Sequence, residues 1–189
     1  FGQAVEKFII ANGGGGNGKG VLNELLCETL GNYAYTAPNE ILLEPIKSGN
    51  NPAVANMNNK RLVLYREPPD NKKICGSAIK ELCGGSEISA RMNYSNNMKT
   101  LLKATHILEC NKKPKIDGRI DDSFGRRLND IPFKSTFTNN NELLDEKLDY
   151  VFKANSYYKT NDFKNKFKCV LFDYLIDYIK EFNNNICDN

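Results

Sequence analysis

The chain has 189 residues, of which 40% are hydrophobic and 26% charged, and its formal net charge is +3. This apolar content suffices for one buried domain with at most a small helical appendage, and so small a charge does not by itself indicate nucleic-acid binding. The six cysteines include no C-x-x-C pair and there is one histidine, which argues against a zinc site. Because no apolar run approaches the roughly 20 residues of a membrane span, we expect no membrane partner.

Two further features concern the origin of the chain. No secretory signal peptide is recognisable, so we expect an intracellular protein with reduced thiols. The chain begins at Phe1 rather than at a methionine, and we therefore expect it to be a piece of a longer protein.

The first expected elements are a strand and a helix joined by a glycine run. Residues 7–12 (KFIIAN) are typical of a short buried strand. Apolar residues at helical spacing from Val21 predict a helix, with Gly31 as its C-terminal stop. The order is therefore strand, glycine-rich turn at residues 13–20, and helix.

The middle of the chain contains one clear strand and one clear helix. Residues 35–59 are rich in Asn and Pro and predict no firm element, whereas 62–65 (LVLY) form an apolar strand ended by two prolines. Residues 74–83 (ICGSAIKELC) are typical of a helix, which Gly84 and Gly85 terminate.

A hairpin and a further strand follow. Residues 87–95 alternate as a strand does, Asn96-Asn97 form a turn, and 99–102 are the return arm. Residues 105–111 (THILECN) predict a buried strand that ends on a polar residue, ahead of a charged loop at 112–123. Strands alternating with helices predict an α/β fold with a mainly parallel sheet.

The tail differs in character from the rest. Apolar residues recur at helical spacing over residues 163–182 and predict an amphipathic helix with Phe and Tyr on one face. We expect that face to pack on the core, with a contact between subunits as the alternative.

The glycine run GGGGNGKG has the composition of a phosphate-binding loop. It fits the pattern G-x-x-x-x-G-K at Gly13, Gly18 and Lys19, but Gly20 stands where the pattern has a serine or threonine that binds magnesium. Backbone N–H groups of such a loop coordinate phosphate oxygens, and the following helix adds its positive end. The alternative is a flexible linker, which would have no need of a strand, a helix and a Gly-Lys pair around it.

Polar residues stand at the ends of two expected strands. Glu67 follows the strand at 62–65, where an ATPase of this kind needs a carboxylate to orient magnesium and to activate water, and Asp70 is close enough to assist. Asn111 ends the next strand and is suited to contact the γ-phosphate or hold the water. The alternatives are an ordinary surface glutamate and a turn-forming asparagine.

A basic pair, Arg126-Arg127, comes later in the chain. A guanidinium presented to the γ-phosphate bound by a neighbouring subunit stabilises the charge of the transition state. The alternative is a solvated basic pair on a helix.

The order of these motifs resembles that of the superfamily 3 helicases, a branch of the AAA+ ATPases, and in particular the helicase part of the primase-helicases of large DNA viruses and some phages. The resemblance covers roughly residues 5–135. It rests on GGGGNGKG, RLVLYREP, IKELCGGSEISAR, ILECNKKP and DDSFGRRLNDIPF. The first motif is common to many ATPases, whereas the last three in this order are more specific.

The resemblance implies a P-loop NTPase, AAA+-like three-layer sandwich, with an ATPase core at 1–150 and a C-terminal helical extension at 151–189. It implies ATP and Mg²⁺ as cofactors. Lys19, Glu67 and Asn111 would be catalytic, and Arg126 or Arg127 would act on ATP bound by the next subunit. The predicted nucleotide-binding residues are Gly13, Gly14, Gly15, Gly16, Asn17, Gly18, Lys19, Gly20 and Val21.

The resemblance also implies partners. Such helicases form hexameric rings in which a hairpin before the strand of Asn111 grips single-stranded or forked DNA in the central pore. In this chain the expected DNA contacts are Arg91, Tyr94, Lys99 and Lys103, with a solvated hairpin face as the alternative. An N-terminal primase region is expected in the full-length protein, which would work in the host-cell compartment where viral DNA replicates.

Gly20 departs from the family pattern at a position that bears on function. We expect a water to replace the missing hydroxyl, with Glu67 or Asp70 holding Mg²⁺ through the outer shell. The leading function is an ATP-driven DNA helicase motor. The alternatives are a P-loop ATPase of another class, such as a DNA-packaging ATPase or a small-molecule kinase, and a nucleotide-binding assembly module that has lost hydrolysis.

Overall fold

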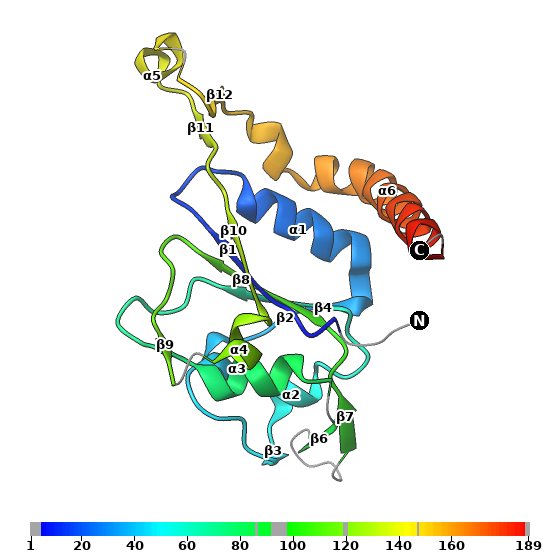
Figure 1. Cartoon of the computed structure of the whole chain (residues 1–189). Coiled ribbons are helices and arrows are strands. Elements are labelled where there is room, and N and C mark those ends of the chain that lie inside the picture. Colours follow the sequence, from blue (N-terminus) through cyan, green and yellow to red (C-terminus); the bar gives the residue numbers. More distant parts are fainter. Residues whose placement is uncertain (1–4, 86, 92–97, 119–120, 147, 188–189) are drawn as a thin grey trace.

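The computed structural model describes residues 5–85, 87–91, 98–118, 121–146 and 148–187. Its centre is a parallel sheet of five strands in the order β10-β1-β8-β4-β2 (Figure 1). The strands are β1 (Phe8–Asn12), β2 (Ala34–Thr36), β4 (Leu62–Arg66), β8 (Thr105–Cys110) and β10 (Leu128–Pro132). Because all pairs in this sheet are parallel, the carboxyl ends of β1, β8 and β4 lie at one edge.

Helices cover both faces of the sheet. Helix α1 (Lys19–Leu30) lies on one face, and α3 (Gly76–Cys83) lies on the other together with the short helix α4 (Asp122–Gly125) (Figure 1). Helix α1 ends at Gly31, whose φ of 52° is a conformation that glycine adopts without strain. These layers confirm the predicted α/β fold with a mainly parallel central sheet.

Short elements fill residues 35–59, where the sequence predicted none, and the few residues just before them. They are the 3₁₀ helix η1 (Gly31–Tyr33), β2, the 3₁₀ helix η2 (Asn39–Leu42), β3 (Gly49–Asn50) and α2 (Pro52–Ala55). The side chain of Asn51 accepts a hydrogen bond from the amide of Val54 and so caps α2, while Pro52 has the fixed φ that suits a first helical position. Elements this short carry no periodicity, which is why the pattern missed them.

Three small sheets surround the central one. Strands β6 (Glu87–Arg91) and β7 (Met98–Leu101) form the predicted antiparallel hairpin, with β3 on its outer edge. Its expected turn, Asn96-Asn97, lies outside the described residues. Strand β5 (Ile74–Cys75) pairs with β9 (Ile116–Asp117), so the helix predicted over 74–83 begins only at Gly76. The third sheet pairs β11 (Thr136–Thr138) with β12 (Val151–Lys153).

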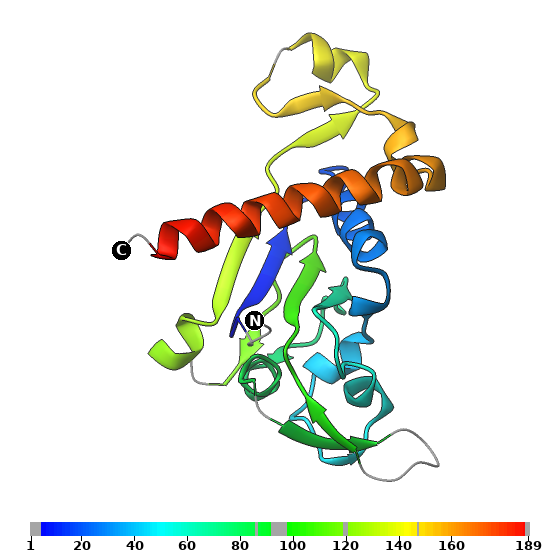
Figure 2. The ribbon, with the colours of Figure 1, turned by 90° about the vertical axis from the view of Figure 1, so that its right-hand side faces the viewer.

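The C-terminal part of the chain consists of α5 (Asn141–Asp145), β12, the 3₁₀ helix η3 (Ser156–Lys159) and the long helix α6 (Asn161–Cys187). Figure 2 shows α6 crossing over the face that α1 covers. Lys164 forms a 2.9 Å ion pair with Glu24 of α1 and lowers the pKa of that carboxyl. The boundary predicted at 150/151 falls just before β12, and the division into two domains stays a prediction.

The expectation that the aromatic face of the tail helix packs on the core is wrong for several of its residues between Val170 and Ile179. Phe163 and Phe167 near its start are half-buried. Beyond them, Leu171 and Leu175 are still half-buried. Six other large apolar side chains are between 36% and 66% exposed, namely Val170, Phe172, Tyr174, Ile176, Tyr178 and Ile179. The later part of α6 extends past α1 (Figure 2). The six exposed side chains give it an apolar surface that faces solvent.

A stack of three rings lies in the centre of the core. His106 is fully buried, and its ring lies parallel to those of Phe8 and Tyr65 at centroid distances of 6.3 and 6.0 Å. The hydroxyl of Tyr65 lies 3.1 Å from His106 Nδ1. Burial lowers the pKa of His106 to about 4.

The depressed pKa of His106 predicts an acid-sensitive fold. The unfolded chain binds a proton at His106 below its ordinary pKa of 6.5, whereas the folded chain binds it only near pH 4. The free energy of unfolding should therefore fall by up to about 3 kcal/mol between those pH values. Urea unfolding of the parent and of His106→Phe across this interval checks the prediction, because the variant should lose that slope. A variant with the parental slope would contradict it.

Candidate functional site

The glycine run forms a tight loop between β1 and α1. Gly13, Gly16 and Gly18 have φ values of 148°, 74° and 84°, which L side chains rarely adopt. A Cβ at Gly13 would also lie 2.4 Å from the carbonyl oxygen of Phe133, so only glycine fits there. The side chain of Asn17 is buried and accepts a hydrogen bond from the amide of Lys19 at 3.3 Å. Backbone packing therefore fixes the shape of the loop.

Three predicted catalytic side chains form one chain of hydrogen bonds at the carboxyl edge of the sheet. Lys19 Nζ donates to Asn111 Oδ1 at 2.8 Å, and Asn111 Nδ2 donates to Glu67 Oε1 at 3.0 Å. Lys19 is only 5% exposed, and its Nζ also donates to the Gly13 carbonyl at 3.0 Å. Residues 92 positions apart in the sequence thus meet, because β8 lies between β1 and β4 in the sheet.

Glu67 has an unusual backbone conformation. Its φ of 42° lies in the left-handed region, which is rare for residues other than glycine and costs roughly 1 kcal/mol or more. The hydrogen bond from its amide to the Glu109 carbonyl, at 2.8 Å, holds this conformation. Glu67 and Asp70 line the same open cavity of about 420 Å³, together with Asn111 and Lys112. This cavity is the place where both carboxylates meet solvent beside the glycine loop.

The space next to Gly20 contains a carboxylate that the sequence analysis did not assign. A Cβ at Gly20 would lie 3.2 Å from Glu109 Oε1, and Asn23 Nδ2 donates to Glu109 Oε2 at 3.2 Å. Glu109 lies near the end of β8, with Leu108 and Cys110 buried on the opposite face. Because side chains alternate between the two faces of a strand, the sequence could have indicated that Glu109 faces away from Leu108 and Cys110.

An apolar pocket of about 380 Å³ adjoins the other side of the loop. The ring of Phe137 covers Gly18, and the Phe137 amide donates to the Gly16 carbonyl at 2.7 Å. The pocket is lined mainly by apolar side chains of α1, β11, η3 and α6, including Val21, Leu22, Leu25, Phe137, Tyr158 and Phe163. No sequence signal pointed to it, because segments more than a hundred residues apart form its walls.

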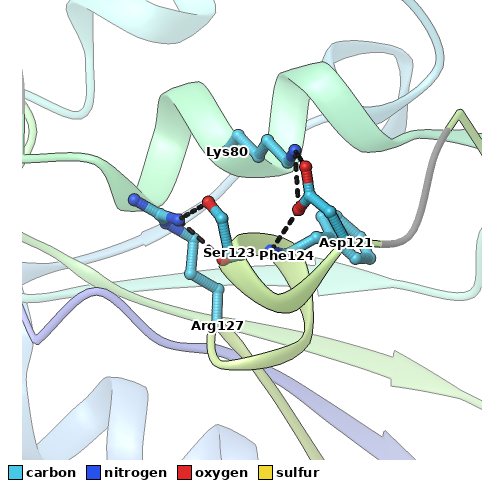
Figure 3. A network of polar contacts seen from close by, with 5 residues as sticks. All are labelled: Lys80, Asp121, Ser123, Phe124 and Arg127. Atoms are coloured by element: carbon cyan, nitrogen blue, oxygen red, sulfur yellow. Dashed lines mark hydrogen bonds and ion pairs between the residues drawn. The ribbon is translucent and has the colours of Figure 1, made fainter.

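The two arginines of the basic pair differ in their surroundings. The Arg126 side chain is 65% exposed, with Glu6 at 3.6 Å as its ion-pair partner. The Arg127 side chain is 12% exposed and donates to both the backbone carbonyl and the hydroxyl of Ser123, at 2.7 and 2.8 Å (Figure 3). Arg127 therefore holds α4 in place, and Arg126 is the guanidinium available to another molecule.

Both arginines lie at the amino edge of the sheet. Arg127 is followed directly by β10, whose first residue Leu128 is level with Phe8 at the start of β1. The glycine loop comes after the last residue of β1, and five residues of strand span about 16 Å. This length exceeds the reach of an arginine side chain, so Arg126 cannot contact a phosphate bound by its own loop.

A second polar contact fixes the start of α4. Lys80 of α3 donates to both carboxylate oxygens of Asp121, at 3.1 and 2.9 Å, and Asp121 accepts from the Phe124 amide at 2.8 Å (Figure 3). The hydrogen bond from Lys80 and that from the Phe124 amide lower the pKa of Asp121. Lys80 thus anchors α4, the short helix directly before the arginine pair.

The predicted DNA-contact residues lie on or near the hairpin. Arg91 ends β6 and is exposed, and Lys103 follows β7 and is half-buried. Lys99 is exposed and forms a 3.2 Å ion pair with Glu87 of the facing strand. Tyr94 lies outside the described residues. The basic side chains are therefore separate from the nucleotide loop, at the end of the molecule where β6 and β7 lie (Figure 1).

The chemistry of the residues at this site fits a nucleoside triphosphate and its magnesium ion. A loop of glycines at a helix start, with a buried lysine, is a site for phosphate oxygens. Among the described residues no three Asp, Glu, His or Cys side chains form a metal cluster. Magnesium bound to a nucleotide needs only one or two carboxylates, because phosphates and waters supply the other ligands.

In the described part of the chain, no helix is long and apolar enough to cross a membrane.

Comparison with curated proteins places the chain among viral proteins. It is 30% identical over 172 residues to primase D5 of fowlpox virus (strain NVSL), which covers 88% of this chain and 22% of the relative. It is 30% identical over 184 residues to the putative helicase L207/L206 of Acanthamoeba polyphaga mimivirus, covering 93% of this chain and 19% of the relative. The uncoating factor OPG117 of monkeypox virus is 33% identical over 74% of the chain and 20% of the relative.

The chain thus spans about a fifth of the length of these relatives. No family model matches it. Among solved structures, the apo NrS-1 C-terminal region shares the fold, with a TM-score of 0.62 at 18% identity over 88% of this chain and 36% of that one. The predicted resemblance to viral primase-helicases is confirmed, and the chain is homologous to a segment of viral primase D5 and of a putative viral helicase.

Proposed function

We propose that this chain is the ATP-driven motor of a viral DNA helicase of superfamily 3. The observation that supports the proposal most strongly is the chain of hydrogen bonds Lys19–Asn111–Glu67 beside a glycine loop. A phosphate-binding lysine, a polar sensor and a carboxylate are the three groups that phosphoryl transfer to water needs in one place. The names of two viral relatives, primase D5 and putative helicase L207/L206, agree with this assignment.

ATP would lie along the loop with its phosphates toward Lys19. The loop amides from Gly13 to Val21 and the start of α1 would bind the phosphates, and the apolar pocket under Phe137 and Tyr158 would take the base. Mg²⁺ would neutralise the β- and γ-phosphate charge, with Glu67 and Asp70 facing it from the cavity of about 420 Å³.

Glu67 would be the residue that activates the attacking water. Its side chain already accepts a hydrogen bond from Asn111, which in turn accepts one from Lys19. Movement of Lys19 toward a γ-phosphate would break its hydrogen bond to Asn111. The Asn111 amide would then be free to shift, and its hydrogen bond to Glu67 would change with the bound nucleotide. Asn111 is thus a positioning group between the phosphate and the carboxylate.

A second subunit would complete the site. Because Arg126 is exposed and lies at the opposite edge of the sheet from its own loop, it is suited to reach the ATP of a neighbour in a ring. The exposed apolar side chains of α6 between Val170 and Ile179 are a further surface that assembly would cover. A hexameric ring, the grip of the β6–β7 hairpin on single-stranded or forked DNA, and a primase region elsewhere in the full-length protein complete the proposal. Its place of action would be the infected host cell.

A second candidate is an assembly module that binds ATP without hydrolysing it. The observation that favours it is Gly20, which lacks the hydroxyl that usually binds magnesium. The two candidates differ in one measurable property, the rate of ATP hydrolysis.

Hydrolysis of ATP with and without single-stranded DNA tests the proposal. The parent should hydrolyse ATP faster when DNA is present, and Lys19→Ala should lose both activity and ATP binding. Lys47→Ala is the matched control, since its side chain is 84% exposed and lies far from the loop in the sequence. A parent whose rate DNA never stimulates would contradict the helicase function, and ATP binding without hydrolysis would favour the assembly module.

A further inference from the structure

The space beside Gly20, at the start of α1, contains the side chain of Glu109 from strand β8. In a loop of this kind the residue after the lysine presents a hydroxyl to magnesium. Here the added Cβ itself would stand 3.2 Å from Glu109 Oε1, a separation tighter than ordinary van der Waals contact. The Glu109 carboxylate therefore lies where a serine or threonine side chain at position 20 would project.

Two contacts fix Glu109 in this position. Asn23, one turn further along α1, is only 3% exposed and donates from Nδ2 to Glu109 Oε2 at 3.2 Å. The backbone carbonyl of Glu109 accepts the amide of Glu67 at 2.8 Å, so the two glutamates are joined at the carboxyl edge of the sheet. Glu109 thus stands between the start of α1 and the proposed catalytic carboxylate, and its Oε1 is the oxygen turned toward Gly20.

We propose that the Glu109 carboxylate replaces the missing hydroxyl and binds the magnesium ion of the nucleotide. The inference rests on the proposed function, since it concerns the ion that accompanies ATP. A carboxylate is a good magnesium ligand, and its charge is attracted to the ion more strongly than a neutral hydroxyl is. This also explains why residue 20 is a glycine, because any side chain there would crowd the Glu109 oxygen that binds the metal. This places the ligand on Glu109, in addition to the outer-shell role expected of Glu67 and Asp70.

The rival explanation is that Glu109 serves only to join β8 to α1 through Asn23. The two explanations differ in what the isosteric change Glu109→Gln does. The amide of a glutamine can still accept a hydrogen bond from Asn23, so the fold is kept while the charge is lost. A purely structural Glu109 would leave metal affinity unchanged in this variant.

Binding of Mn²⁺ to the ATP-loaded full chain tests the proposal by electron paramagnetic resonance, because Mn²⁺ takes the same oxygen ligands as Mg²⁺. Glu109→Gln should weaken Mn²⁺ binding by about 10-fold or more. Binding of ATP in the presence of EDTA should stay at the parental level. Glu28→Gln is the matched control, since Glu28 is an exposed glutamate on the same helix that faces the site.

A second variant restores the ordinary ligand. In Gly20→Ser combined with Glu109→Ala, which removes the side chain that a serine at position 20 would meet, the hydroxyl returns and Mn²⁺ affinity should recover toward the parental value. Parental Mn²⁺ affinity in Glu109→Gln, or a loss that the serine does not repair, overturns the inference while leaving Lys19-dependent ATP binding intact. A parent that binds no ATP overturns the proposed function itself, and the inference with it.

Discussion

Arg126→Ala is expected to lower DNA-stimulated ATP hydrolysis by about 10³-fold or more, the scale on which an arginine acting in trans stabilises phosphoryl transfer. ATP binding and thermal stability should change little, because the Arg126 side chain is 65% exposed and its Glu6 contact is a surface ion pair. Steady-state hydrolysis, nucleotide binding and thermal unfolding of the same protein samples measure the three quantities.

Arg127→Ala is the contrasting variant. The Arg127 side chain is 12% exposed and binds Ser123 through two hydrogen bonds, so its removal should destabilise the fold by about 2 kcal/mol. Its effect on hydrolysis should follow from that destabilisation and from displacement of α4. The opposite pattern, with Arg126 silent in hydrolysis, would contradict the assignment.

Mixing variants tests whether Arg126 acts between subunits. Subunits carrying Arg126→Ala keep an intact Glu67, and subunits carrying Glu67→Gln keep an intact Arg126. A mixture of the two should regain hydrolysis at those interfaces where the intact residues meet, although each variant alone hydrolyses ATP only slowly. Absence of recovery in the mixture would place the arginine and its ATP in the same subunit, against the sheet-length separation described above.

Glu67→Gln is expected to lower the rate of ATP hydrolysis by about 10²- to 10⁴-fold, the usual contribution of a general base. ATP binding should persist, since Lys19 and the loop remain, and glutamine preserves the size of the side chain. Single-turnover hydrolysis together with equilibrium binding of ATP separates the two effects. Asp70→Asn is the matched control in the same cavity, and its smaller expected effect would identify Glu67 as the activating carboxylate.

Much of the site could be predicted from local signals. A glycine run between an apolar strand and an amphipathic helix is encoded over some twenty residues, and the dihedrals of Gly13, Gly16 and Gly18 agree with that interpretation. Glu67 and Asn111 stand directly after buried strands, and carboxyl ends of parallel strands meet at one edge. The hydrogen bonds among Lys19, Asn111 and Glu67 are the consequence.

Other features needed the tertiary structure. Nothing in the sequence distinguishes Arg126 from Arg127. In the folded chain, packing around α4 leaves the Arg126 side chain exposed and largely buries that of Arg127. The aromatic face of residues 163–182 has the pattern of a core helix, yet Val170, Tyr174 and Tyr178 on it are exposed. The short elements at 34–55 follow from contacts with distant strands rather than from their own periodicity.

By itself, the sequence determined the layered α/β fold, the phosphate loop and the polar residues at the strand ends, because each depends on the periodicity and chemistry of neighbouring residues. Only the tertiary structure decided what lies beside Gly20. The identity of that neighbour depends on the strand order β1-β8-β4, which brings Glu109 under the start of α1 from 89 positions away in the chain. Contacts of such separation are set by packing, which no local pattern encodes.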